Sequence, residues 1–224
     1  MRYRRQLIMD EIGKAGQQKI EDTTIAIIGC GGLGSANIYN LAALGIKKII
    51  LIDNDKVELS NLNRQYIHNH DDLGKFKAQS AQEKVNKLNN NVETVISCKR
   101  LDESNIVELL SDADIIIDAV DNIETRYLLD EYCTKYNKPV FFGAVEGLYG
   151  TIYARLSTKM KPYSAIFNKT KAAKKEIGVV GAAVSVISSI QCTEVLKYIV
   201  LERKENSMLL HIDLLNNRIE RLKV

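Results

Sequence analysis

Cysteine and proline are both scarce in this chain of 224 residues. Its four cysteines are Cys30, Cys98, Cys133 and Cys192, and no two of them lie within thirty residues of each other. This spacing excludes a Cys-x-x-Cys zinc pair, and a chain of this length buries enough surface on folding to need no disulfide scaffold. Only two prolines occur, and no segment is repeated or of low complexity. The sequence therefore predicts a globular protein rather than a fibrous or disordered one.

A large excess of charge and a long apolar run are also missing. The chain holds 31 basic and 28 acidic residues, a net charge of +3, which predicts no nucleic-acid-binding face and no membrane-binding patch. The N-terminus lacks the apolar core of a signal peptide. The one long apolar stretch, residues 177–193, is shorter than the about 20 residues of a membrane span, so we expect a buried helix there. These absences favour a cytoplasmic protein with reduced thiols.

Apolar segments typical of strands alternate with amphipathic segments typical of helices through residue 144. We expect strands at 24–28, 48–52, 92–98, 115–119 and 140–144. The helices between them are expected near 35–44, 75–88, 104–110 and 123–136. Nearly all strand residues are apolar, as in a parallel sheet with both faces covered. The pattern predicts an α/β fold with a Rossmann-like, mostly parallel sheet flanked by helices.

The last third of the chain changes pattern. We expect a strand at 151–156, a polar stretch over 157–177 and the buried helix near 181–201. Two short strands, 208–213 and 218–222, follow, and Asn216-Asn217 is a plausible hairpin turn between them. These C-terminal strands are expected to extend the sheet antiparallel. We therefore predict a single domain over residues 1–224, with residues 1–22 as an N-terminal arm.

A glycine-rich turn follows the first strand. The turn is Gly29-Cys30-Gly31-Gly32-Leu33-Gly34, and a helix begins after it. Glycines allow the backbone to approach a phosphate, and a helix N-terminus supplies free N–H donors. Asp53 ends the next strand, where an acid can accept hydrogen bonds from ribose hydroxyls. These residues predict a nucleotide site that suits NAD and ATP equally.

Polar residues after the second strand distinguish the two nucleotides. Cations and amides there could hold a triphosphate and neutralise charge during phosphoryl or adenylyl transfer, whereas a dinucleotide needs fewer cations. The residues concerned are Asp55, Ser60, Asn61, Arg64, Gln65 and Lys77. Asp121 and Asn122 follow the strand at 115–119, where an acid facing phosphates is a candidate Mg²⁺ ligand. The alternative role of this pair is to cap the helix at 123–136, and both roles can hold together.

These motifs, in this order, resemble those of the ThiF/MoeB/HesA family, bacterial relatives of the adenylation domain of ubiquitin-activating enzymes. The match covers nearly the whole chain. It consists of Arg2-Tyr3-Arg4-Arg5-Gln6, the glycine turn, Asp53-Asn54-Asp55, Ser60-Asn61-Leu62-Asn63-Arg64-Gln65, Leu73-Gly74-Lys75-Phe76-Lys77, Asp121-Asn122 with Arg126, and Gly178-Val179-Val180-Gly181 before a helix with Gln191 and Glu194.

The resemblance implies a homodimer that binds ATP and Mg²⁺ and adenylates the C-terminal Gly-Gly of a ubiquitin-like sulfur carrier, for thiamine or molybdopterin biosynthesis. It assigns catalytic roles to Arg5, Arg64, Lys77 and Asp121, with Asp121 on Mg²⁺ and Arg5 reaching the neighbouring subunit's site. It also implies that the nucleotide is contacted by a larger set of residues: Gly29, Gly31, Gly32, Gly34, Asp53, Asp55, Ser60, Asn61, Arg64, Gln65, Lys77 and Asn122. Residues 157–177 become a crossover loop over the carrier's tail. The thiamine carrier is our first expectation.

The chain departs from the family pattern in its cysteines. Many members carry four zinc cysteines, which are missing here, so we predict no structural zinc. Lys174 occupies a position where members often have a cysteine, and Cys192 lies mid-helix among apolar neighbours, where packing is its expected role. We therefore expect the reaction to stop at the acyl-adenylate, with sulfur delivered by a separate sulfurtransferase. Cys30 is expected to reflect local fit in the turn.

Two segments and three alternative functions remain open. Lysines at 159, 161, 169, 171, 174 and 175 either steer an acidic carrier or belong to a solvated loop. Residues 68–72 contain metal-ligand types but are predicted to be polar surface. The alternatives are an NAD-dependent oxidoreductase, a non-catalytic partner that docks a carrier, and an enzyme that adenylates a peptide carboxylate in antibiotic biosynthesis.

Overall fold

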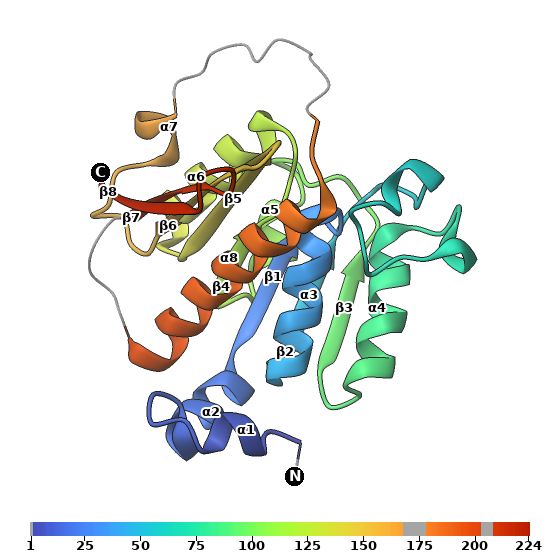
Figure 1. Cartoon of the computed structure of the whole chain (residues 1–224), viewed down its shortest axis with the longest axis horizontal. Helices are drawn as coiled ribbons and strands as arrows, with labels where there is room; N and C mark the ends of the chain where they lie inside the picture. The colour runs from blue at the N-terminus through green and yellow to red at the C-terminus, as the bar shows by residue number, and fades with distance from the viewer. Residues whose placement is uncertain (1, 168–177, 203–207) are drawn as a thin grey trace.

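An eight-stranded sheet forms the centre of the molecule in the computed structural model, which describes residues 2–167, 178–202 and 208–224 (Figure 1). The strand order is β3-β2-β1-β4-β5-β6-β7-β8. The strands are β1 Thr24–Ile28, β2 Lys48–Ile52, β3 Glu93–Ser97, β4 Ile115–Asp118, β5 Val140–Glu146, β6 Tyr149–Arg155, β7 Met208–Asp213 and β8 Arg218–Lys223. Pairs among β1 to β5 are parallel, and the pairs from β5 to β8 are antiparallel. The predicted α/β fold with antiparallel C-terminal strands is confirmed.

Helices cover both faces of the sheet because its strands are apolar on both sides. In β1, Ile25 and Ile27 enter a core with helices α3, α4 and α8, whereas Ala26 and Ile28 enter a second core with α5 and α6. The helices are α1 Arg4–Leu7, α2 Gly13–Asp22, α3 Gly32–Leu44, α4 Lys77–Leu88, α5 Ile106–Leu110, α6 Ile123–Tyr136, α7 Tyr163–Ile166 and α8 Gly181–Leu201. This two-sided burial is typical of parallel sheets.

The strand order places a topological switch between β1 and β4. The chain moves from β1 outward to β2 and β3, then returns to β4 on the other side of β1. Open α/β sheets bind ligands outside the carboxyl ends of the strands at such a point. The glycine turn lies at the carboxyl end of β1, whereas α1 and α2 lie at its amino end (Figure 1).

Most predicted elements occur with small shifts at their ends. Helix α3 begins at Gly32, three residues before the predicted start, because the helix opens inside the glycine turn. Helix α4 begins at Lys77 rather than residue 75, because Phe76 is extended and forms a β-bridge with Lys56. Strand β3 is shorter than predicted, and β5 and β6 are longer, since they pair through to the turn at Gly147.

Helix α8 is, within the described residues, the one helix long and apolar enough to cross a membrane by length and composition. One face packs against α3, β5 and β6, with Ile187, Val195 and Ile199 buried. The opposite face stays exposed along Ala182, Val186, Ser189 and Thr193. The prediction of a buried helix is thus correct for one face of α8.

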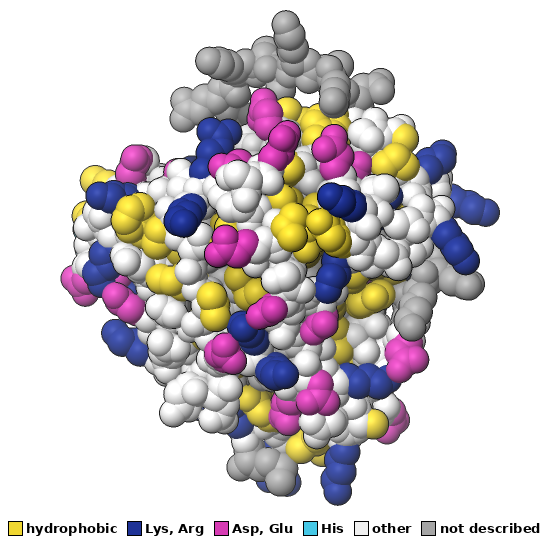
Figure 2. Space-filling view, turned by 180° about the vertical axis from the view of Figure 1, so that it is seen from behind, with side chains coloured by type: hydrophobic (Ala, Val, Ile, Leu, Met, Phe, Trp, Pro, Cys, Tyr) yellow, Lys and Arg dark blue, Asp and Glu magenta, His cyan; other side chains and the backbone are white. Residues whose placement is uncertain are grey.

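Acidic and basic side chains are interspersed on the face of the molecule seen in Figure 2, with small apolar patches between them. No single-sign field dominates that face, which agrees with the net charge of +3.

Candidate active site

The glycine turn is fitted closely between β1, β4 and α3. Gly29 has a φ of +96°, and a Cβ there would lie 2.6 Å from the Ala119 carbonyl oxygen. A Cβ on Gly34 would lie 2.0 Å from the Gly29 carbonyl oxygen. Both positions therefore require glycine for the turn to close. The turn leaves the N-terminus of α3, a 13-residue helix, at the carboxyl edge of the sheet.

Asp53 fixes this turn through its carboxylate. Oδ2 accepts a hydrogen bond from the Cys30 N–H at 2.7 Å, and Oδ1 accepts from the Asp55 N–H at 2.7 Å. Burial raises the pKa of Asp53, while the hydrogen bond from Cys30 and the charge of Lys77 act against the rise. Each oxygen keeps a second lone pair that can accept from a ribose hydroxyl. The structure thus places Asp53 beside the glycine turn, as predicted.

Lys77 is paired with Asp55. Its Nζ lies 2.9 Å from Asp55 Oδ2, and its backbone N–H donates to the Asp55 carbonyl oxygen at 2.8 Å. The lysine side chain is 9% exposed and the aspartate side chain 60% exposed. The first turn of α4 therefore holds a nearly buried cation next to the residues that follow β2.

The segment from Ser60 to Gln65 begins in a 3₁₀ turn at Leu59–Asn61. Asn61 is buried, and its Oδ1 accepts from the Glu58 N–H at 3.1 Å. Arg64 Nη1 donates to the carbonyl oxygen of exposed Ser60 at 2.9 Å. Asn61 thus shapes the turn. Nη1 of the half-buried Arg64 also donates to Asn63 Oδ1 at 3.0 Å, while its Nε and Nη2 have no hydrogen-bond partner within the described part of the chain and can serve a ligand.

Gln65 is buried against the glycine turn. A Cβ on Gly31 would lie 3.5 Å from its Nε2. Its Oε1 is buried and has no hydrogen-bond partner among the described residues. Leaving such an acceptor unpaired costs about 1 to 3 kcal/mol. An unpaired amide oxygen beside the turn is suited to receive a donor from a bound nucleotide.

Asp121 and Asn122 have separate roles at the carboxyl end of β4. Asn122 caps α6, because its Oδ1 accepts from the Thr125 N–H at 2.9 Å. The predicted capping role is confirmed for Asn122. Asp121 is exposed. The described residues contain no group of three or more His, Cys, Asp or Glu side chains placed to hold a metal. Mg²⁺ needs only one or two protein carboxylates when phosphates and water complete its shell, so Asp121 fits that role.

A buried ion pair that sequence reasoning did not assign supports this end of β4. Arg126 Nε lies 3.0 Å from Asp118 Oδ2, and Arg126 Nη2 donates to the carbonyl oxygens of Val120 and Gly143, each at 2.8 Å. These bonds fix the backbone that leads into Asp121. Arg126 belonged to a matched motif, but Asp118 ends an apolar strand and gave no signal of its own.

Arg5 does not join the other predicted residues within one chain. It is exposed on α1, at the end of the sheet opposite the glycine turn (Figure 1). A role for Arg5 at a nucleotide site therefore requires a second copy of the chain.

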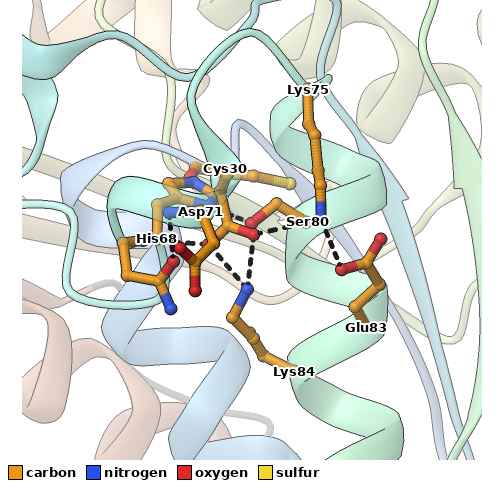
Figure 3. Close-up of polar contacts among 9 residues, drawn as sticks. Cys30, His68, Asp71, Lys75, Ser80, Glu83 and Lys84 are labelled. Carbon is orange, nitrogen blue, oxygen red and sulfur yellow. Dashed lines mark hydrogen bonds and ion pairs between the residues drawn. The ribbon is translucent and has the colours of Figure 1, made fainter.

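The prediction that residues 68–72 form ordinary polar surface is wrong for two of them. His68 is 4% exposed and Asp72 is 1% exposed. Asp72 pairs with Lys84 at 2.6 Å, and His68 bonds to Ser80 and to the glycine turn (Figure 3). The segment folds back under α4, so its polar residues have partners inside the protein.

The cysteines are free, and three of them, Cys30, Cys133 and Cys192, are buried. Cys192 lies in the hydrophobic core, in agreement with the predicted packing role, and burial raises the pKa of its thiol to about 12. Lys159 and Lys161 are described, whereas the lysines at 169, 171, 174 and 175 lie outside the described residues.

Comparison with known proteins agrees with this geometry. The model of the ThiF family matches residues 3–224. The "SAMP-activating enzyme E1" of Haloferax volcanii is 36% identical over 210 residues, which are 90% of this chain and 76% of that protein. The "sulfur carrier protein adenylyltransferase" of Thermus thermophilus is 33% identical over 206 residues, with 88% and 76% covered.

Other relatives are longer. The "adenylyltransferase and sulfurtransferase MOCS3" of Aedes aegypti is 35% identical, and the match spans 88% of this chain but 46% of that protein. A crystal structure of MccB from E. coli superposes with a TM-score of 0.87 at 22% identity, covering all of this chain and 72% of MccB, which supports the fold. A family match over nearly every residue, with relatives above 30% identity, shows that the chain belongs to the ThiF family.

Proposed function

We propose that this chain is an ATP-dependent adenylyltransferase that activates the C-terminal carboxylate of a ubiquitin-like sulfur carrier ending in Gly-Gly. The observation that supports the proposal is the arrangement at the carboxyl ends of the strands: Asp53 holds the glycine turn, Lys77 lies against Asp55 after β2, and Asp121 follows β4. The relatives from Haloferax and Thermus, named for sulfur carriers or SAMP proteins, support this substrate class.

The proposed reaction needs positioning and charge rather than a general base. A carboxylate oxygen of the carrier attacks the α-phosphorus of ATP, the bond to the bridging oxygen breaks, and pyrophosphate leaves with the electron pair. The carboxylate is already a nucleophile, so alignment and stabilisation of the leaving group suffice. Arg64 and Lys77 neutralise phosphate charge, and the N–H groups at the start of α3 bind phosphate oxygens.

Mg²⁺ is the proposed metal, with Asp121 as its protein ligand. When bound, the ion supplies charge neutralisation on the phosphates. The pair between Arg126 and Asp118 stabilises the backbone before Asp121.

A homodimer would bring Arg5 to the neighbouring subunit's site. Support comes from the exposed, uncharged stripe of α8 and from a groove of about 380 Å³ between α8, α3 and Gln6. Gln6 neighbours Arg5 on α1, so a second chain docked on this face would approach the arm that carries Arg5.

We further propose that the protein is cytoplasmic and forms a single adenylation domain. Its reaction stops at the acyl-adenylate, and a separate sulfurtransferase delivers sulfur to the carrier. The high thiol pKa of Cys192 disfavours a covalent thioester on it. The sulfur carrier of thiamine or of molybdopterin synthesis is the proposed partner class. Arg64, Lys77 and Asp121 disfavour an NAD-dependent oxidoreductase, because hydride transfer does not need these residues. They also disfavour a non-catalytic docking role, because a docking subunit would not need to retain residues that hold phosphates.

ATP–pyrophosphate exchange tests the proposal. Purified protein, Mg²⁺ and each Gly-Gly carrier of the source genome are incubated with labelled pyrophosphate, and label in ATP is measured. Exchange that depends on one carrier and on its terminal glycine is expected. Binding of ATP without exchange by any carrier would favour a peptide substrate or a docking role, and binding of NAD instead of ATP would favour an oxidoreductase.

A further inference from the structure

His68 joins the glycine turn to α4 through two hydrogen bonds. Its Nε2 lies 3.0 Å from the Cys30 carbonyl oxygen, and its Nδ1 lies 2.8 Å from Ser80 Oγ. Figure 3 shows the imidazole in this position. The ion pair between Lys84 and Asp72 lies next to it. A carbonyl oxygen only accepts hydrogen bonds, so Nε2 carries a proton. In the neutral ring Nδ1 is then an acceptor, and it faces the Ser80 hydroxyl.

The surroundings of the imidazole favour this neutral form. Burial lowers the pKa of His68 below its ordinary 6.5, and the charges of Lys77 and Lys84 on α4 lower it further. The hydrogen bond to Cys30 and the charge of Asp72 raise the pKa, but the net shift is downward. Asp72 accepts from Lys84 Nζ at 2.6 Å and from the Asn69 N–H at 2.9 Å, and the Ser80 hydroxyl is a third donor beside it. The Ser80 hydroxyl thus lies between His68 and Asp72, and it is the Cys30 carbonyl that sets the proton on Nε2.

The bond from His68 also sets the direction of the next peptide group. The Cys30 N–H is held by Asp53, and the Cys30 carbonyl is held by His68. In a trans peptide the carbonyl and the following N–H point in opposite directions. The Gly31 N–H is thus turned away from His68, and no described residue accepts a hydrogen bond from it. It is a free donor at the start of α3.

We propose that His68 is a positioning residue for nucleotide binding: by holding the Cys30 carbonyl, it directs the Gly31 N–H at a phosphate of ATP. The inference rests on the proposed function and extends it to a residue outside the shell that touches ATP. Ser80 supports His68 by holding the orientation of its ring. His68 touches neither the carrier nor the reacting atoms in this arrangement.

Two substitutions separate the bond to Cys30 from the rest of the side chain. An asparagine amide reaches only the position of Nδ1, whereas a glutamine amide reaches the position of Nε2 and can donate to the Cys30 carbonyl. His70→Asn is the matched control, because His70 is exposed two residues away. Binding of ATP and of adenosine is measured by titration calorimetry for wild type, His68→Asn, His68→Gln and His70→Asn, with thermal unfolding as a check of folding.

We expect His68→Asn to weaken ATP binding on the order of tenfold, the usual effect of losing one hydrogen bond to a charged group. Adenosine binding should be unchanged, because adenosine has no phosphate to meet the Gly31 N–H. His68→Gln and His70→Asn should bind ATP like wild type. In the exchange assay, the KM for ATP of His68→Asn should rise more than its kcat falls.

The contrary outcomes are distinct. Wild-type ATP binding by folded His68→Asn would overturn the inference, and so would equal losses for ATP and adenosine, which would indicate a merely structural role. If His68→Asn does not fold, Ser80→Ala replaces it, with an expected loss of ATP affinity of about threefold; unchanged affinity would overturn the inference. Normal ATP binding by wild type without exchange on any carrier would reject the proposed function and leave the ATP–adenosine comparison for His68 intact.

Discussion

The ammonium group of Lys77 lies 2.9 Å from the carboxylate of Asp55, so the lysine assigned to the triphosphate is already paired with an acid. Lys77 is nearly buried, whereas Asp55 is mostly exposed. Asp55 is therefore the partner that can turn to solvent while Lys77 stays in place. Separating the pair would leave a nearly buried cation without a partner, so another anion has to take the place of the carboxylate. We infer that ATP binding exchanges this carboxylate for phosphate oxygens at Lys77.

Asp121→Ala is expected to abolish adenylation with the fold retained. The side chain is exposed, so its removal costs little stability, but the proposed Mg²⁺ loses its protein ligand. Pyrophosphate exchange and thermal unfolding measure the two effects. Glu124→Ala, an exposed acid in the first turn of α6, is the matched control and should stay active. Full activity of Asp121→Ala would refute the metal role.

Arg5→Ala should lose activity alone and regain it in a mixed dimer with Asp121→Ala. One of the two sites in such a dimer keeps both its own Asp121 and an intact Arg5 from the other chain, so about half of the wild-type activity is expected per mixed dimer. Differently tagged chains, co-purified and assayed by exchange, provide the measurement. Arg4→Ala, the exposed neighbour, serves as control. A confirmed mixed dimer without activity would argue against a shared site.

Cys192→Ser is expected to leave the adenylation step intact. With a pKa of about 12, the thiol is protonated at neutral pH and is neither a nucleophile nor a phosphate contact. The substitution places a hydroxyl between apolar neighbours, which should lower the free energy of unfolding by about 1 to 2 kcal/mol. Exchange rate and chemical denaturation measure the two quantities. A large loss of exchange in the folded variant would contradict the packing role.

Asp130→Ala should be strongly destabilising. Asp130 Oδ1 lies 2.7 Å from Arg155 Nη1, both side chains are buried, and the same oxygen accepts from the Tyr163 N–H at 2.9 Å. Removing one partner leaves a buried charge unpaired, which costs about 3 to 5 kcal/mol. Urea denaturation measures the change. Asp112→Ala removes an exposed partner of Lys48 and should cost at most about 1 kcal/mol; equal effects of the two variants would contradict the argument.

Sequence reasoning located the strands well because burial on both faces makes each a short apolar run. The ends of β1, β2, α6 and α8 agree with the prediction. The start of α4 was missed because the pairing of Phe76 with Lys56 is a tertiary contact that no local pattern encodes.

The candidate site was predictable where its chemistry lies in contiguous motifs. Asp53 lies beside the glycine turn, with which its motif was grouped as a nucleotide site. The pairing of Lys77 with Asp55 was not predicted, and the contact of Lys77 with a triphosphate stays a prediction. The burial of His68 was not predictable, because it depends on how residues 68–72 fold against α4. Asp118 was missed for the same reason, since only the packing of α6 brings Arg126 to it.

Gln191 on α8 forms buried hydrogen bonds with residues of α3, β4 and β5 and so joins four elements. Its Nε2 donates to the carbonyl oxygens of Asp118 and Phe141, its Oε1 accepts from Asn37, and a Cβ on Gly143 would lie 2.7 Å from it. A change at 37, 143 or 191 alone leaves either a clash or an unpaired buried amide. We therefore expect relatives to keep these three residues together or to exchange them together, and a designed sequence for this fold has to choose all three at once.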